Sequence, residues 1–220
     1  MTGSVVCEGA DLCQELARDT DTSFVRTYQG DPPTRRILET ENLALIADMS
    51  PLVAGHLLLL PKAHFLSFSG VVRVHLAELE GLVEKIAPRY RDTFGELLIL
   101  EHGSSVDGHG NACITHAHWH LLPVDGAEVD RLIKADGLTH TDLTDLIELG
   151  ARRWTEQPYF LRGYDGRMRV YEPSPDTRRQ YLRSVVGAVL SIDTPLWDYA
   201  LVIRKELLRE TMRSVRHWAR

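Results

Sequence analysis

Short apolar runs separated by turn residues mark the first half of the chain. Two of them, "NLALIADM" (42–49) and "HLLLLPK" (56–62), flank a segment that contains Pro51 and Gly55. Proline and glycine favour turns, so we expect two adjacent antiparallel strands here. "ELLILEHG" (96–103) predicts a third strand, and "ITHAHWHLLP" (114–123) predicts a fourth after a polar, glycine-rich loop.

A helical repeat lies between the second and third of these strands. Apolar side chains recur three or four residues apart over 74–90, at Leu76, Leu79, Val83, Ile86 and Tyr90. This spacing predicts one amphipathic helix that faces a sheet, and Pro88 is expected to kink or loosen its last turn. Residues 7–18 predict a further short helix. Strands, a helix and further strands in this order indicate an α+β fold rather than a doubly wound sheet.

The second half of the chain has a different character. Residues 141–154 predict a helix, and 158–172 predict a hairpin whose turn is Asp165-Gly166. Two closing helices are expected over 176–190 and 197–218. We therefore divide the chain into a unit that carries the histidine run, 1–129, and a mainly helical C-terminal extension, 130–220, that packs on it.

Composition narrows the classes of partner and compartment. The 220 residues are 44% hydrophobic, enough to bury a core without covalent cross-links. The net charge of −6 argues against nucleic acid as a partner, because such proteins usually carry a basic patch. No apolar run reaches the roughly 20 residues of a membrane span, and the N-terminus lacks a signal-peptide pattern. Three scattered cysteines, Cys7, Cys13 and Cys113, predict a reducing cytoplasm.

The fourth predicted strand places His116, His118 and His120 at every second position. Alternate side chains of a strand point to the same face, about 6.6 Å apart per step. The three imidazoles therefore share one face. The residues between them face a core: Ala117, Trp119 and Leu121. A purely structural role would require separate hydrogen-bond partners for three buried rings.

Two chemical interpretations compete with that structural one. Zinc holds its histidine ligands at about 2.0–2.1 Å, whereas the outer two histidines lie about 13 Å apart along a strand. A metal site would therefore use two of them and a distant ligand, and Cys7 and Cys13 lack the usual Cys-x2-4-Cys zinc spacing. Alternatively, the central ring attacks phosphorus while its neighbours donate to the phosphate oxygens. Two imidazolium charges 4 Å apart repel by about 4 kcal/mol, so at least one ring stays neutral, as a nucleophile must. The geometry favours this second interpretation.

A second segment, "ADMSPLVAGHLLLLPKAH" (47–64), precedes the histidine run. Together the two segments resemble the histidine triad (HIT) family of nucleotide hydrolases and transferases. That family combines Asp-x-x-Pro, Gly-His, Pro-Lys-x-His and His-x-His-x-His, which here begin at Asp48, Gly55, Pro61 and His116. The resemblance covers residues 36–124. It implies an antiparallel sheet of about five strands, a long helix packed against it, and a nucleotide bound across the strands.

The resemblance also implies roles for individual residues. His118 would be the nucleophile and form a nucleotidyl-histidine intermediate, which His116 and His120 would stabilise together with the phosphate. His64 would support the triad from the neighbouring strand, and Asp48 would hold the ribose hydroxyls. The histidine at the third position of this motif is similar to that of the hydrolases, because the uridylyltransferase-like branch has glutamine there. No metal or other cofactor is implied.

Two short motifs of the small family members are altered here. Their Asn-x-Gly before the loop and their Gly-Gln-Ser ahead of the triad correspond to residues 101–103 and 111–113. Asn111 and Cys113 would then lie at the substrate, with the Cys113 thiol a weaker phosphate donor than a hydroxyl. His102 and His109 lie in the loop region and are expected to be ordinary loop residues; the alternative is that they cover the substrate.

The extension resembles a segment of a longer bacterial branch of the family. Its Gln180 and Arg183 lie three residues apart and would share one helical face. They would reach into the nucleotide site, with Arg183 as a phosphate clamp. The alternative is a solvated helix face without a role in the site.

The sequence thus predicts a cytoplasmic hydrolase that cleaves at the α-phosphorus of a nucleoside phosphate derivative. The candidate substrates are dinucleoside polyphosphates, nucleoside phosphoramidates and nucleotide-linked small molecules. A nucleotidyltransferase with an acceptor other than water and a non-catalytic nucleotide-binding protein are the alternatives. Small family members commonly form a homodimer through the long helix, a surface that the extension would cover in a monomer.

Overall fold

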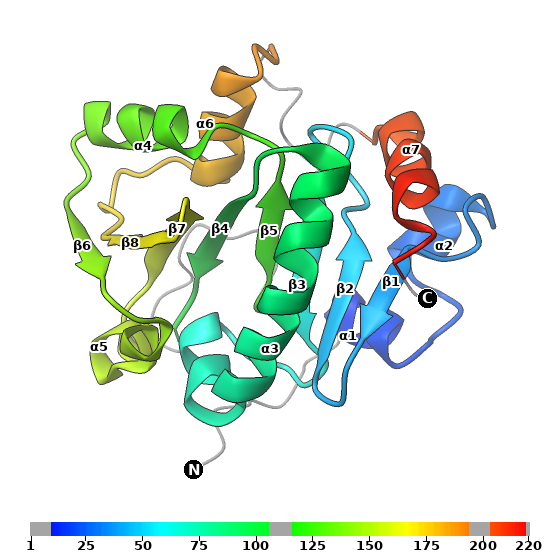
Figure 1. The fold of residues 1–220 in the computed structure, drawn as a ribbon, viewed down its shortest axis with the longest axis horizontal. Helices are drawn as coiled ribbons and strands as arrows, with labels where there is room; N and C mark the ends of the chain where they lie inside the picture. The colour runs from blue at the N-terminus through cyan, green and yellow to red at the C-terminus, as the bar shows by residue number, and fades with distance from the viewer. Residues whose placement is uncertain (1–9, 106–115, 194–202, 219–220) are drawn as a thin grey trace.

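A single antiparallel sheet of eight strands forms the centre of the computed structural model, which describes residues 10–105, 116–193 and 203–218 (Figure 1). The strand order across the sheet is β1-β2-β3-β5-β4-β7-β8-β6. The strands are β1 (Arg36–Glu39), β2 (Leu43–Ala47), β3 (Leu57–Pro61), β4 (Leu98–Gly103), β5 (Trp119–Leu122), β6 (His140–Leu143), β7 (Tyr159–Tyr164) and β8 (Arg167–Tyr171).

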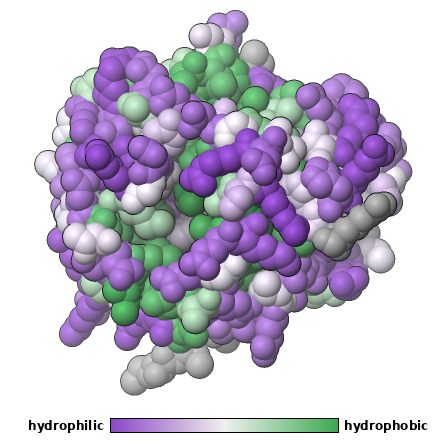
Figure 2. Space-filling model, viewed as in Figure 1, coloured by the Kyte–Doolittle hydropathy of each residue, from purple (hydrophilic) through white to green (hydrophobic). Residues whose placement is uncertain are grey.

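Helices cover both faces of this sheet. They are α1 (Asp11–Leu16), α2 (Ser23–Tyr28), α3 (Phe68–Phe94), α4 (Gly126–Ala135), α5 (Arg152–Glu156), α6 (Tyr181–Val189) and α7 (Lys205–Val215), with a 3-10 turn η1 (Leu146–Gly150). The long helix α3 crosses the front of the sheet in Figure 1. Side chains of α3 share the largest apolar core with Leu59, Trp119 and Leu121. The outer surface over α3 is mostly hydrophilic (Figure 2).

Two smaller cores lie on the opposite face of the sheet. One joins Leu12 of α1 to Leu58 and Leu60 of β3. The other joins α4 and α6 to Leu100 and Leu122, on β4 and β5. The strand β5 lies between β3 and β4, and its His120 faces the same side of the sheet as these two cores. The histidines therefore lie between α1, which packs on β3, and α6, which packs on β4 and β5.

The four predicted strands are confirmed as β2, β3, β4 and β5, with one change of length, and the predicted hairpin is confirmed as well. β2 and β3 are adjacent and antiparallel, and β7 and β8 form the predicted hairpin. Its turn residues Asp165 and Gly166 both have positive φ, 50° and 70°, as a type I′ turn requires. The histidine strand is shorter than predicted, since β5 begins at Trp119.

The long helix is confirmed but runs from Phe68 to Phe94. The predicted kink at Pro88 is wrong, because the non-helical backbone lies at His75 (φ −132°, ψ 25°) and the helix continues past the proline. Gly95, at φ 90°, ends it.

The predicted helix over 141–154 is also wrong. This segment forms β6, η1 and α5, because pairing of β6 with β8 outweighs the local helical pattern. The extension thereby adds three strands, with β7 paired to β4, so the sheet has eight strands within the described residues rather than about five. The boundary at residue 129 stays a prediction.

No helix within the described part of the chain is both long and apolar enough to cross a membrane.

Candidate active site

His118 lies immediately before β5 and is 6% exposed. Its Nδ1 is 2.8 Å from the carbonyl oxygen of His116. A carbonyl oxygen only accepts hydrogen bonds, so Nδ1 carries the hydrogen and the neutral ring has its lone pair on Nε2. Burial lowers the pKa of His118, against the opposing effect of the carbonyl. His118 is therefore neutral at pH 7, with Nε2 as a base.

A chain of hydrogen bonds sets the tautomer of His120 as well. The backbone N–H of Leu52 donates to Nδ1 of His56 over 3.2 Å, which leaves the hydrogen of His56 on Nε2. That atom is 2.9 Å from Nδ1 of His120, so His120 in turn carries its hydrogen on Nε2. Burial lowers the pKa of His56 to about 4 and that of His120 well below its usual value. The ring centroids of His118 and His120 are 4.8 Å apart, so a neutral donor lies beside a neutral base.

Asp48, at the end of β2, is held by three groups. Its Oδ1 accepts from the backbone N–H of Ser50 over 2.7 Å, and its Oδ2 is 3.2 Å from both Arg183 Nη1 and His56 Nε2. Burial acts to raise the pKa of Asp48, but the electrostatic interaction with His56, the charge of Arg183 and the hydrogen bond from the Ser50 N–H hold it below its usual value. The resemblance implied that Asp48 holds the ribose hydroxyls of a nucleotide. Because this carboxylate is already paired with an arginine, that role stays a prediction.

Arg183 and Gln180 reach this site from the extension. Both are buried, at 6% and 4% exposure, so the alternative of a solvated helix face is wrong. Gln180 precedes α6 in a left-handed conformation (φ 56°), so it does not share a helical face with Arg183. The second Arg183 nitrogen, Nη2, donates to the carbonyl of Ser50 over 2.8 Å. The extension is thus part of the histidine site.

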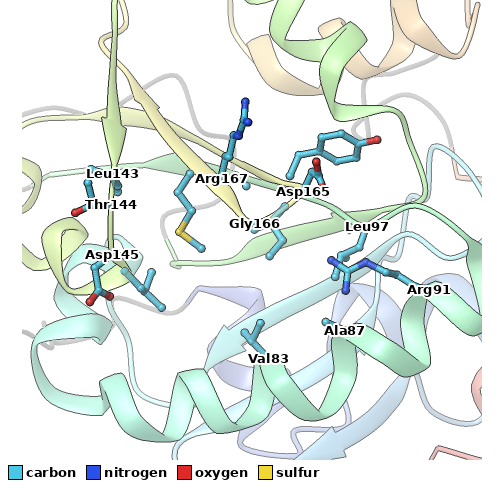
Figure 3. A pocket seen from close by; sticks show the side chains of 15 residues that line it. Val83, Ala87, Arg91, Leu97, Leu143, Thr144, Asp145, Asp165, Gly166 and Arg167 are labelled. Atoms are coloured by element: carbon cyan, nitrogen blue, oxygen red, sulfur yellow. The ribbon is translucent and has the colours of Figure 1, made fainter.

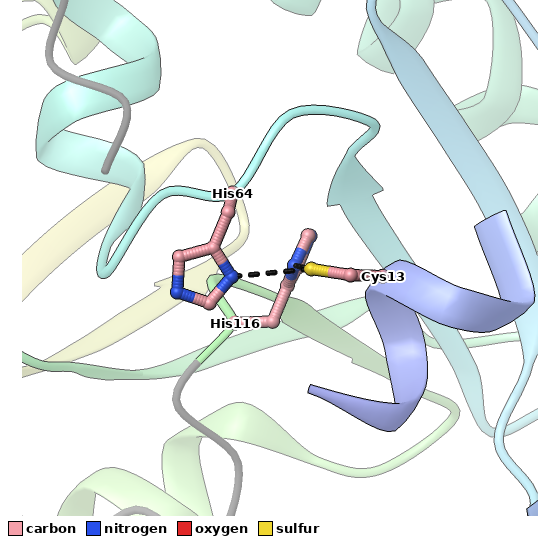
Figure 4. Close-up of side chains that lie close together, drawn as sticks. All are labelled: Cys13, His64 and His116. Carbon is pink, nitrogen blue, oxygen red and sulfur yellow. Dashed lines mark hydrogen bonds between the residues drawn. The ribbon is translucent and has the colours of Figure 1, made fainter. Parts of the chain in front are cut away.

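His116 points into a separate cluster with His64 and Cys13 (Figure 4). Its Nε2 donates to the carbonyl of Pro61 over 2.7 Å, and its Nδ1 is 3.1 Å from Cys13 Sγ. The same sulfur is 3.2 Å from His64 Nδ1. Both ring nitrogens of His116 are therefore engaged away from His118, while its carbonyl orients that ring. This geometry supports a positioning role for His116, and its predicted phosphate contact stays a prediction.

One thiol and two imidazoles form a donor set that zinc accepts. The spacing of the cysteines does not reveal this set, because the partners of Cys13 are histidines 51 and 103 residues further along the chain. A zinc ion bound by Cys13, His64 and His116 would join α1 to the segment before β5, in a structural role. A second candidate set, Asp48 with His56 and His120, fits a cation poorly because the arginine already neutralises its carboxylate.

A cavity of about 320 Å³ lies on the other face of the sheet, between α3 and the β7–β8 turn (Figure 3). Val83 and Ala87 of α3 and Ile99 of β4 line it, and Ile99 belongs to the core under α3. It is therefore separate from the histidines.

Among the sequence-predicted residues, Cys7, His109, Asn111 and Cys113 lie outside the described residues.

Residues 29–127 match the family model of the HIT domain. A HIT-like protein of Mycobacterium tuberculosis is 30% identical over 116 residues, which are 52% of this chain and 78% of that protein. The chain belongs to the HIT family. The adenosine 5′-monophosphoramidase HNT1 of Candida albicans is 21% identical over 119 residues, 49% of this chain and 73% of that protein. The crystal structure of a HIT family protein from Bacillus anthracis covers 54% of this chain and 74% of its own, with 18% identity and a TM-score of 0.41.

The HIT match contains both motif segments, from Asp48 to the last histidine of the triad. It ends before α6, so Arg183 is a feature of this chain's extension. Sequence reasoning missed one member of the site. His56 was part of the Gly-His motif but received no role, although it relays a hydrogen bond to His120.

Proposed function

We propose that this HIT protein is a nucleotide hydrolase that cleaves at the α-phosphorus of a nucleoside phosphate derivative. The intermediate is a nucleotidyl group bonded to Nε2 of His118. The observation that carries the proposal is the tautomer of His118: with Nδ1–H held by the His116 carbonyl, Nε2 is a lone-pair nitrogen on a buried neutral ring. Nucleophilic catalysis requires this state at pH 7.

The reaction proceeds in two displacements. In the first, the Nε2 lone pair of His118 forms a bond to phosphorus, and the bond to the leaving group breaks. The leaving group takes that electron pair and a proton from solvent. In the second, a water molecule attacks the same phosphorus and loses a proton, and the P–N bond breaks with its electrons returning to Nε2. The products are a nucleoside monophosphate and the free leaving group.

Two groups beside His118 suit the charge on the phosphate. His120 carries a hydrogen on Nε2 and stacks edge-on to the nucleophile at 4.8 Å. Arg183 brings a guanidinium into the same buried region, and guanidinium groups bind phosphate oxygens well. Preorganised donors of this kind supply most of the stabilisation in phosphoryl-type transfer.

The relative named as an adenosine 5′-monophosphoramidase makes adenosine 5′-phosphoramidate the first substrate to test. Diadenosine polyphosphates and adenylyl-linked small molecules complete the panel, each with its guanosine counterpart. A transferase would pass the nucleotidyl group to an acceptor other than water. A binding protein would not need the free lone pair on His118, which is why we favour an enzyme.

The test is steady-state release of nucleoside monophosphate by the full chain. His118→Ala should reduce the rate at least about 1,000-fold, since loss of a covalent nucleophile has effects of that order or larger. His140→Ala, at an exposed histidine of β6, is the matched control and should leave the rate unchanged. Wild-type rates in His118→Ala would refute the proposal, and nucleotide binding without turnover of any panel member would favour a binding protein.

A further inference from the structure

His102 lies on β4 and belongs to none of the motif segments that define the triad. It is 7% exposed, so the expectation of an ordinary loop residue is wrong. Its ring packs edge-on against Phe160, with centroids 5.1 Å apart at 86°. This imidazole lies on the same sheet face as the nucleophile. Burying it costs free energy of folding unless its ring nitrogens form hydrogen bonds.

The strand register indicates where His102 lies relative to His118. β4 and β5 pair Leu98 with Leu122, and Leu100 with His120, while β3 pairs Leu58 with His120 on the other side of β5. His118 directly precedes the paired strand. Extending both registers by one step on the same face would set His118 between the fully buried Leu60 and His102.

A backbone hydrogen bond also sets the tautomer of His102. The N–H of Leu182, in the first turn of α6, donates to Nε2 of His102 over 3.1 Å. Nε2 is therefore an acceptor, and the neutral ring carries its hydrogen on Nδ1. Burial, together with the electrostatic interaction with His118 and the charge of Arg183, lowers the pKa of His102 to about 3. Within the described part of the chain, no acceptor is assigned to this Nδ1–H. The nitrogen is also not among the fully buried side-chain atoms that lack a hydrogen-bond partner, so it is not closed off from solvent.

We propose that His102 is a further catalytic residue, whose Nδ1–H donates a hydrogen bond to a non-bridging phosphate oxygen while His118 attacks. The helix α6 and Phe160 hold the ring in place, and its neutral state avoids repulsion with the imidazolium that forms on His118. Thus the extension supplies Arg183 and also orients a donor of the sheet. This inference rests on the proposed function.

Three substitutions at His102 distinguish the role of its Nδ1 as a donor from the role of its Nε2 as an acceptor. The side-chain nitrogen of asparagine lies near the position of Nδ1, so His102→Asn keeps the donor and loses the acceptor for Leu182. His102→Gln places its amide near Nε2 and can still accept from Leu182, but it has no donor at Nδ1. His102→Phe keeps the ring shape and has neither. Unfolding temperatures show whether each variant is folded.

If the Nδ1–H acts on the phosphate, kcat falls about 100-fold in His102→Gln and His102→Phe, and stays within about threefold of wild type in His102→Asn. The reverse order, with Gln active and Asn impaired, would show that His102 only positions α6 and would overturn the proposal. Equal activity of all three variants, or an equal loss in all three, would overturn it too.

A second measurement does not depend on turnover or on any substitution being tolerated. In wild-type protein labelled with 15N-histidine, the proposal predicts a protonated Nδ1 and an unprotonated Nε2 for His102. Adding adenosine 5′-monophosphate should shift the Nδ1–H proton signal downfield, and an unchanged signal at saturating nucleotide would overturn the proposal. Absence of nucleotide binding would instead refute the proposed function as well. Binding with the shift, but with no hydrolysis, would refute hydrolysis and leave the phosphate contact standing.

Discussion

The ion pair between Asp48 and Arg183 joins the two halves of the chain and carries the first prediction. Both side chains are under 10% exposed, and the charged atoms are 3.2 Å apart. At an effective dielectric of 20, Coulomb's law gives about 5 kcal/mol of attraction at this distance. Arg183→Met removes one partner, leaves Asp48 buried, and is expected to lower the free energy of unfolding by about 3–5 kcal/mol.

A double-mutant cycle isolates this interaction. Asp48→Asn, Arg183→Met and the double variant are unfolded in urea and monitored by circular dichroism and tryptophan fluorescence. Because the double variant leaves no unpaired charge, its loss of stability should fall short of the sum of the single losses by at least about 2 kcal/mol. Single losses that add to within about 0.5 kcal/mol would show that the two side chains do not interact in solution, and the account of the extension as part of the site would then be wrong.

Three further predictions concern other parts of the molecule. His56 has a folded pKa of about 4 against 6.5 when unfolded, so its contribution to stability is complete above pH 6.5 and is lost as the pH falls through 4. The urea midpoint should therefore decrease from pH 7 to pH 5. Burial raises the pKa of Glu101 to about 7, so this carboxyl acts in the opposite direction and reduces the decrease. A midpoint that rises instead would contradict the assignment of neutral buried histidines. Micromolar Zn²⁺ should raise the unfolding temperature of wild type and not of Cys13→Ser, and an equal response would exclude the thiol as a ligand. Gly103→Ala should destabilise by at least about 1–3 kcal/mol, because its Cβ would lie 2.3 Å from an aromatic ring, whereas Gly81→Ala, with open space in α3, should be neutral or stabilising in the same urea assay.

Local patterns predicted the elements whose signals are local. The apolar runs of β2 and β3 and the Asp165-Gly166 turn carry enough information in a few residues to define strands and a hairpin. The histidine run shows the limit of such patterns. Alternation predicted one strand for all three rings, but the backbone N–H of Ala117 bonds to the carbonyl of Phe65, and the paired strand begins only at Trp119. Tertiary hydrogen bonds, which no local pattern contains, decided where the strand starts.

The rest of the site depends on pairings across long sequence separations. Arg183 meets Asp48 from 135 residues away, and the sequence offered only a resemblance for it. His102 could have been found by counting along β4 from Leu100, had the pairing of β4 with β5 been known. Cys13 would have required knowing that α1 lies over the segment before β5. The sequence therefore indicated the proposed nucleophile, whereas the groups that orient it and neutralise charge around it became visible only in the fold.

The central claim is the covalent bond between His118 and phosphorus. The most direct measurement is mass spectrometry of wild-type protein quenched within milliseconds of mixing with adenosine 5′-phosphoramidate, under alkaline conditions that preserve P–N bonds, followed by mapping of the modified peptide. We predict an adenylyl adduct on the peptide that contains residues 116–120, absent from His118→Ala and retained in His140→Ala. Hydrolysis at the wild-type rate by His118→Ala, or an adduct on any residue other than His118, would contradict it.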